Sequence, residues 1–68
     1  MKRDHYLVEG IGNSDMKTQV KNALENIDGV NGVCVDMARG SVEVMYNSPA
    51  TSSEIKSCIE NTGHKIRE

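Results

Sequence analysis

The stretch Tyr6–Ile27, which reads YLVEGIGNSDMKTQVKNALENI, decides the fold of this chain. Its first four residues alternate weakly between the two sides of a strand, and Tyr6 and Val8 share the side that we expect to face inward. Glycines at positions 10 and 12 end this strand. Apolar residues then recur at helical spacing and predict one buried helix face, which consists of Met16, Val20, Ala23, Leu24 and Ile27.

The predicted helix has a start signal and a stop signal. Asn13 or Ser14 can serve as its N-cap, because a short polar side chain there accepts a hydrogen bond from one of the first free backbone amides. Gly29 suits its end, where a left-handed backbone conformation costs glycine no steric strain. We therefore expect the helix to begin next to Asn13 or Ser14 and to run up to Gly29.

The remaining sequence predicts two strands joined by a turn, a second helix and a last short strand. Val33, Val35 and Met37 alternate onto one face of the second strand, which we expect to be the inner face. Thr51 and Glu54 form a capping box for the second helix, in which each side chain bonds the other's backbone amide. The predicted ranges are a strand at Val30–Met37, a turn at 38–41, a strand at Val42–Tyr46, a helix between Thr51 and Gly63, and a strand at His64–Arg67.

The order of these elements is strand, helix, strand, strand, helix, strand. Because each half holds a right-handed strand-helix-strand crossover, both helices should cover the same face of a four-stranded antiparallel sheet. This arrangement is the α+β ferredoxin-like sandwich. The other sheet face should meet water or a partner, and it is predicted to carry Leu7, Cys34, Asp36, Glu43 and Met45.

Length and composition predict a single domain over residues 1–68, because a chain of 68 residues supports only one small core. The formal net charge of -2 and the two aromatic residues, Tyr6 and Tyr46, argue against nucleic acid as a partner. No apolar run approaches the roughly 20 residues that span a bilayer, and the N-terminus does not resemble a signal peptide. We expect a soluble, cytoplasmic protein that does not associate with membranes.

The two cysteines are expected to stay reduced. Cys34 lies between Val33 and Val35 in an alternating strand, so it points away from the core if the valines point into it. Cys58 lies on the apolar stripe of the second predicted helix, which should cover the core side of the sheet. The two sulfur atoms would then lie on opposite sheet faces, too far apart for a disulfide. Reduced thiols agree with a cytoplasmic location.

Six segments, at residues 8–11, 20–24, 29–36, 42–44, 54–60 and 63–64, together resemble the heavy-metal-associated domain of copper chaperones and P-type metal ATPases. The resemblance implies the same ferredoxin-like fold and a role in binding or moving a soft metal ion. In that family the first loop reads roughly GMTCxxC, and its two cysteines bind Cu(I) or a similar ion.

The resemblance places Asn13 and Met16 at the two cysteine positions of the family's metal loop. Thiolates are soft anionic ligands, whereas an amide oxygen is hard and neutral and a thioether is soft but uncharged. The ion site is therefore predicted to be degenerate. His64 follows the glycine after the second helix, where the family places a residue beside the loop, so Met16 and His64 could form a weak two-donor site. The predicted interaction loop comprises Gly12, Asn13, Ser14 and Asp15.

Three classes of function follow from these observations. The favoured one is a non-catalytic module that binds a metal-transport ATPase or another heavy-metal-associated domain, or modulates metal transfer between others. The alternative is a weak carrier of Cu(I) or another soft ion that uses Met16 and His64, or Cys34 across a dimer. An enzyme is disfavoured, because acylphosphatases of this topology need an arginine loop and no arginine occurs between Asp4 and Ala38. A monomer or a weak homodimer is expected.

Overall fold

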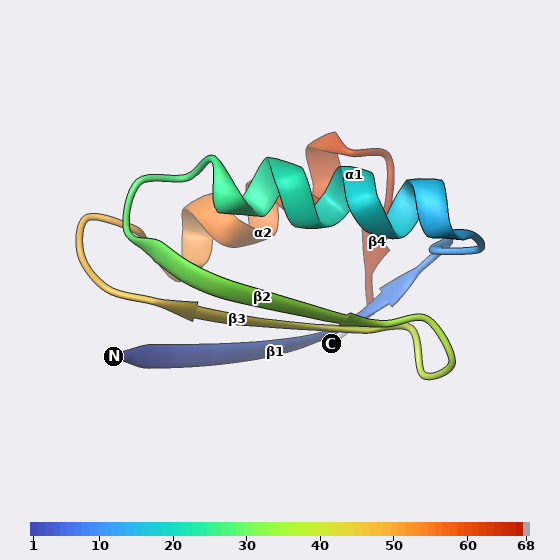
Figure 1. The fold of residues 1–68 in the computed structure, drawn as a ribbon, viewed down its shortest axis with the longest axis horizontal. Helices are drawn as coiled ribbons and strands as arrows, with labels where there is room; N and C mark the ends of the chain where they lie inside the picture. Colours follow the sequence, from blue (N-terminus) through green and yellow to red (C-terminus); the bar gives the residue numbers. More distant parts are fainter. Residues whose placement is uncertain (68) are drawn as a thin grey trace.

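The six elements follow the predicted order along the chain. In the computed structural model, which describes residues 1–67, they are β1 (Lys2–Glu9), α1 (Ser14–Glu25), β2 (Val30–Asp36), β3 (Ser41–Tyr46), α2 (Ser52–Asn61) and β4 (Lys65–Ile66). The strands form one sheet in the order β2-β3-β1-β4, and all neighbouring strands are antiparallel. Both helices lie on the same face of this sheet (Figure 1). The predicted α+β ferredoxin-like sandwich is confirmed.

The core lies between the helices and the inner face of the sheet. Val20 and Leu24 from α1 and Ile55 and Ile59 from α2 are fully buried. The predicted inner face of α1 is thus confirmed at its centre, because residues three to four positions apart share one side of a helix, and α2 buries its own stripe in the same way. The strands contribute the rest of the inner layer, namely Tyr6, Val8, Val33, Val42, Val44 and Tyr46. Within residues 1–67, no helix has the length and hydropathy needed to cross a membrane.

Two strand boundaries differ from the prediction. β1 begins at Lys2 rather than Tyr6, because residues with no apolar alternation still pair with β3, starting with Lys2 opposite Tyr46. β2 ends at Asp36, whose side-chain oxygen Oδ1 accepts hydrogen bonds from the backbone amides of Ala38 and Arg39 at 3.0 and 3.3 Å. This turn removes Met37 from the strand and leaves it 40% exposed, so its predicted inward position is wrong.

The helix ends also differ in part. α1 ends at Glu25 with Asn26 as its C-cap, four residues before Gly29. Gly29 lies in the following turn with φ +101°, where a β-carbon would collide with the backbone oxygen of Asn47. Glycine is therefore required there for strand packing rather than as the helix stop. Gly63 follows the α2 C-cap with φ +94°, as predicted.

Thr51 caps α2 as predicted, but only half of the capping box has the expected form. Its side-chain oxygen accepts a hydrogen bond from the backbone amide of Glu54 at 3.2 Å. The Glu54 carboxylate accepts from the Thr51 hydroxyl at 3.4 Å, whereas the prediction placed it against the backbone amide of Thr51. The start of α2 is nevertheless fixed by this pair of side chains.

The outer sheet face has the predicted composition. The strand register places Cys34 of β2 opposite Glu43 of β3, and Glu43 opposite His5 of β1. Cys34 and His5 are exposed, and Glu43 is half-buried. Cys58 is half-buried on the helix side of the sheet, and both cysteines are free thiols. His5 is thus an exposed residue within β1.

A cluster of polar side chains joins β1, β3 and α2 at the end of the sandwich that holds the N-terminus. Oδ2 of Asp4 accepts hydrogen bonds from the hydroxyls of Tyr6, Ser52 and Tyr46 at 2.6, 2.7 and 3.1 Å. Partial burial alone would raise the pKa of the Asp4 carboxyl, but these hydrogen bonds and the charge of Lys56 outweigh it and hold the pKa below its usual value. Burial and the bond to Asp4 raise the pKa of Tyr6. A single carboxylate therefore fixes three elements.

Replacing Asp4 with alanine should lower the free energy of unfolding by about 1–3 kcal/mol near neutral pH, because three partly buried hydroxyls lose their shared charged acceptor. Only Tyr46 and Ser52, whose hydroxyl oxygens are 2.8 Å apart, can then still bond each other. A carboxylate with a lowered folded-state pKa contributes stability above its unfolded pKa and loses it as the pH falls through the folded value. The difference between wild type and Asp4→Ala should thus shrink below about pH 4. Urea denaturation at both pH values tests this, with exposed Asp28→Ala as the control. A pH-independent difference would contradict the assignment.

Candidate functional site

The candidate site is the loop between β1 and α1, and it is anchored by a buried side chain. Gly10 has φ +88°, which turns the chain sharply after β1. Ile11 follows it and is 7% exposed, so it belongs to the core. Gly12, Asn13, Ser14 and Asp15 are exposed. No role was predicted for Ile11, although a lone apolar residue between two glycines is a signal that could have revealed its buried position.

Asn13 is the N-cap of α1, which resolves the choice between Asn13 and Ser14. Its backbone is extended (φ −154°), and its side-chain oxygen accepts a hydrogen bond from the backbone amide of Met16 at 2.9 Å. Its carbonyl oxygen accepts the first helical hydrogen bond, from Lys17, at 3.1 Å. Ser14 is the first residue of the helix itself. The two positions where the family resemblance places cysteines are therefore joined by a capping hydrogen bond.

The side chain of Met16 bends back over the loop. Its sulfur atom Sδ lies 3.5 Å from the backbone nitrogen of Gly12, which donates a weak hydrogen bond to it. The residue is 36% exposed, so it lies at the rim and not within the core. Met16 thus has a structural role inside the loop, while part of its thioether remains accessible.

His64 holds the other side of the loop. It is only 9% exposed, and its ring nitrogen Nδ1 lies 3.2 Å from the backbone oxygen of Glu9. A carbonyl oxygen only accepts, so Nδ1 carries the proton in this contact and Nε2 is the nitrogen with a free lone pair in the neutral ring. A β-carbon at Gly10 would come within 3.2 Å of Nδ1, so the glycine makes room for the imidazole.

Met16 and His64 both contact the loop, but at different points. The methionine sulfur faces Gly12, and the histidine faces Glu9 and Gly10. Within residues 1–67 there is no group of three or more His, Cys, Asp or Glu side chains that could hold a metal ion. The loop therefore offers a thioether and an imidazole, both soft or intermediate neutral donors, and no thiolate. That these two side chains bind one ion together stays a prediction.

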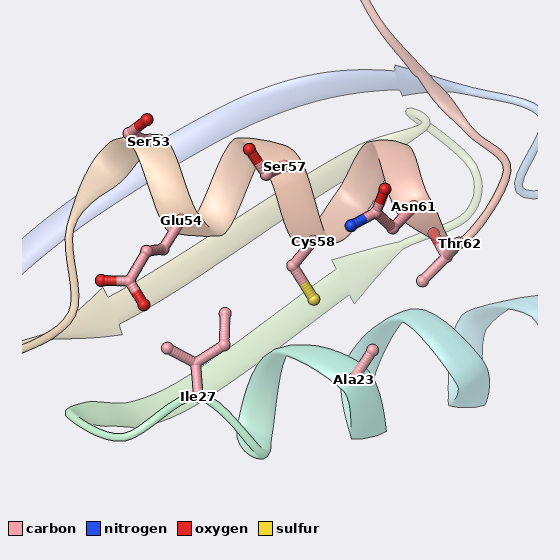
Figure 2. A pocket seen from close by; sticks show the side chains of 8 residues that line it. All are labelled: Ala23, Ile27, Ser53, Glu54, Ser57, Cys58, Asn61 and Thr62. Carbon is pink, nitrogen blue, oxygen red and sulfur yellow. The ribbon is translucent and has the colours of Figure 1, made fainter.

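A hollow lies away from this loop, between the two helices. It has a volume of about 530 Å³, and in Figure 2 the sulfur of Cys58 points across it toward α1, near Ala23 and Ile27. Burial raises the pKa of the Cys58 thiol, which keeps it protonated and makes it a poor metal ligand. Neither cysteine thus supplies a thiolate to the loop, since Cys34 lies on the opposite sheet face.

A four-stranded sheet with two helices on one face and a helix-capped loop after β1 defines a small ferredoxin-like domain. The sequence profile described as "Heavy-metal-associated domain" matches residues 6–65. The chain belongs to this heavy-metal-associated family.

Several characterised proteins are similar to the chain over almost its whole length. "Copper chaperone CopZ" of Staphylococcus aureus is 36% identical over 67 residues, which cover 97% of this chain and 98% of that protein. The solved structure of "CopZ metallochaperone" is 35% identical and has a TM-score of 0.93, covering 96% of this chain and 98% of that one. The N-terminal domain of a potential copper-translocating P-type ATPase from Bacillus subtilis is 26% identical, with a TM-score of 0.87 and coverage of 94% and 81%.

Replacing Asn13 with alanine should destabilise the domain by about 1 kcal/mol, because the Met16 amide loses its capping acceptor. Ser14→Ala is the matched control and should change the free energy of unfolding by less than about 0.5 kcal/mol, since Ser14 is exposed and is not the cap. Urea denaturation of both variants measures the difference. Equal effects, or a larger effect of Ser14→Ala, would contradict the assignment of Asn13 as the cap.

Proposed function

We propose that this chain is a cytoplasmic, non-catalytic, copper-chaperone-like module with a degenerate ion site, which acts by binding another protein. Its partner would be a metal-transport ATPase or another heavy-metal-associated domain, and its effect would be to modulate metal transfer. Membership of the heavy-metal-associated family and similarity to copper chaperones along almost the whole chain support this general role.

The observation that carries the proposal is the hydrogen bond between the Asn13 side chain and the backbone amide of Met16. In a two-thiolate site, the ion itself joins the two ligand positions and neutralises their charges. In this chain the neutral side chain of Asn13 links the same two positions by a hydrogen bond, without an ion. The loop would therefore keep its shape whether or not copper is present, and docking would not depend on metal loading.

The charge of the loop also supports a weakened ion site. Asp15 is the only ionised side chain between Gly10 and Met16. The nearby Glu9 carboxylate lies 3.8 Å from the guanidinium of Arg67, which already balances its charge. A Cu(I) ion placed between Met16 and His64 would receive only neutral donors, and such a site should hold it far less tightly than two thiolates.

The end of the molecule around the loop is suited to contact with a protein. The amide of Val8 donates to the Gly40 carbonyl at 2.6 Å, which places the β2–β3 turn beside the end of β1. Figure 1 shows this turn and the β1–α1 loop at the same end of the sandwich. Met16 and Met37 are 36% and 40% exposed there, and exposed methionines adapt to varied protein surfaces.

The second candidate function is a weak carrier of Cu(I). It is favoured by one observation, namely that Met16 and His64 both contact the loop while the His64 Nδ1 contact leaves Nε2 free. A thioether and an imidazole are ligands that Cu(I) accepts. The two candidates differ in what the ion does, because the carrier needs the ion for function whereas the interaction module does not.

A titration of the ¹⁵N-labelled chain distinguishes these candidates. We expect the apo heavy-metal-associated domain of a copper ATPase from the same genome to shift amide signals of residues 10–16 and 63–64. We expect Cu(I) alone, buffered with millimolar glutathione, to leave the same signals unchanged, because two neutral donors do not compete with thiolates. NMR chemical-shift mapping measures both arms. The double variant Asn13→Cys, Met16→Cys is the positive control and should retain Cu(I) under these conditions.

Matched variants assign any copper effect to side chains. Met16→Leu and His64→Gln remove the proposed donors, while Met37→Leu and His5→Gln alter an exposed methionine and an exposed histidine away from the loop. The carrier would be established if the wild type retains Cu(I), the two variants at the proposed donors lose it, and the two control variants keep it. The same outcome would contradict the interaction module. Failure of the double-cysteine variant to bind Cu(I) would show that the assignment of Asn13 and Met16 to the ligand positions is wrong.

A further inference from the structure

Strand β2 forms an open edge of the sheet. Among residues 1–67 it pairs with β3 alone and is the last strand on its side. In an edge strand, every second residue directs its backbone N–H and C=O away from the sheet, where another strand can pair with them. Helix α1 packs over the face of this part of the sheet and not along its rim (Figure 1). The edge is therefore a template for an additional strand.

The two edges of the sheet differ in how they are protected against such pairing. β4, on the other side, has two residues, and its neighbourhood carries the charged side chains of Lys65 and Arg67. β2 has seven residues, reading VNGVCVD, with Asp36 at its end as its one charge and without lysine, arginine or proline. Short length and charged residues are the usual means by which proteins keep edge strands apart. β2 has neither.

The register within β2 selects a symmetric mode of pairing. Its pairing with β3 is irregular between Val30 and Gly32 and regular from Gly32 to Asp36. The middle residue of this regular segment is Cys34. An antiparallel pair of two identical strands centred on Cys34 uses the full regular segment of each copy, whereas shifted registers use less of it.

The side chains of β2 fit this symmetric pairing. Val33 and Val35 point to the helix side and Cys34 to the open face, so the two-fold pairing places Val33 of each copy opposite Val35 of the other. Val35 is half-buried in the single chain and would gain an apolar neighbour. Each Asp36 would face Gly32 of the other copy, which avoids opposing like charges.

We propose that β2 is a self-association edge, at which two copies of this chain pair antiparallel about Cys34 and join their sheets into one. Opposite residues in antiparallel strands point to the same side, so the helices of both copies cover the same face of the joined sheet. The contact is small compared with stable protein interfaces, so the dimer is weak and forms at high chain concentration. Because the strands run in opposite directions, the two loops at residues 10–16 lie at opposite ends of the dimer, free for other partners.

Analytical ultracentrifugation of the full chain with reductant, from micromolar to about 1 mM, tests this inference. The weight-average mass of the wild type should rise toward that of a dimer. Cys34→Lys should abolish the rise, because two lysines would meet at the symmetry axis. His5→Lys is the matched control, since His5 is exposed on the same sheet face but on the interior strand β1. It should associate like the wild type.

An isotope-filtered NOE measurement on a mixture of labelled and unlabelled wild type needs no variant. It should show contacts between Val33 of one copy and Val35 of the other. A chain that stays monomeric up to about 1 mM would overturn self-association and leave the edge open to an extended peptide of another protein. Loss of association in His5→Lys, or intermolecular contacts confined to the outer sheet face, would overturn the edge-to-edge arrangement.

Discussion

The burial of two narrow helix stripes on one face of the sheet is the constraint on which the rest of this domain depends. Each helix contributes two fully buried residues, Val20 and Leu24 from α1 and Ile55 and Ile59 from α2. With so few contacts, a helix that rotates or slides loses much of its buried apolar area. The start of α1 is therefore fixed relative to the end of β1, and Ile11 extends the core into the loop between them. The position of the loop is a consequence of the packing.

The sequence was sufficient to predict every element and the inner faces at the centres of the helices and strands, because periodicity reports which side of an element is buried. It failed where the deciding contacts lie between distant segments. The first residues of β1 lack apolar alternation, and only their pairing with β3 makes them a strand. Met37 continued the alternation of β2, but the side chain of Asp36 bonds the backbone after it and turns the chain. The Asp4 cluster could not be predicted, because its members are separated by up to 48 residues.

In the candidate site as well, the sequence indicated a contact between nearby residues more directly than a contact between distant ones. The capping role of Asn13 was one of two predicted choices, since it depends on residues three positions apart, and the structure selects it. The bond between His64 and the Glu9 carbonyl joins residues 55 positions apart, and sequence reasoning placed His64 beside the loop only through the family resemblance. The contact of the Met16 sulfur with Gly12 was not anticipated, because Met16 had been assigned to the apolar stripe of the helix. Whether Met16 and His64 act on one ion stays a prediction.

The hydrogen bonds of the Asp4 cluster and those between Gly12 and Met16 differ in sequence range, and this has a consequence for motion. At the N-terminal end, Asp4 is bonded to residues 42 and 48 positions away, so separating these groups requires β1, β3 and α2 to come apart together. Between Gly12 and Met16 the bonds span three or four residues and can break and re-form without disturbing any other element. We therefore expect local opening, in the sense of native-state hydrogen exchange, between Gly12 and Met16 before the Asp4 cluster separates. The loop can thus adjust its shape while the contacts of the Asp4 cluster stay in place.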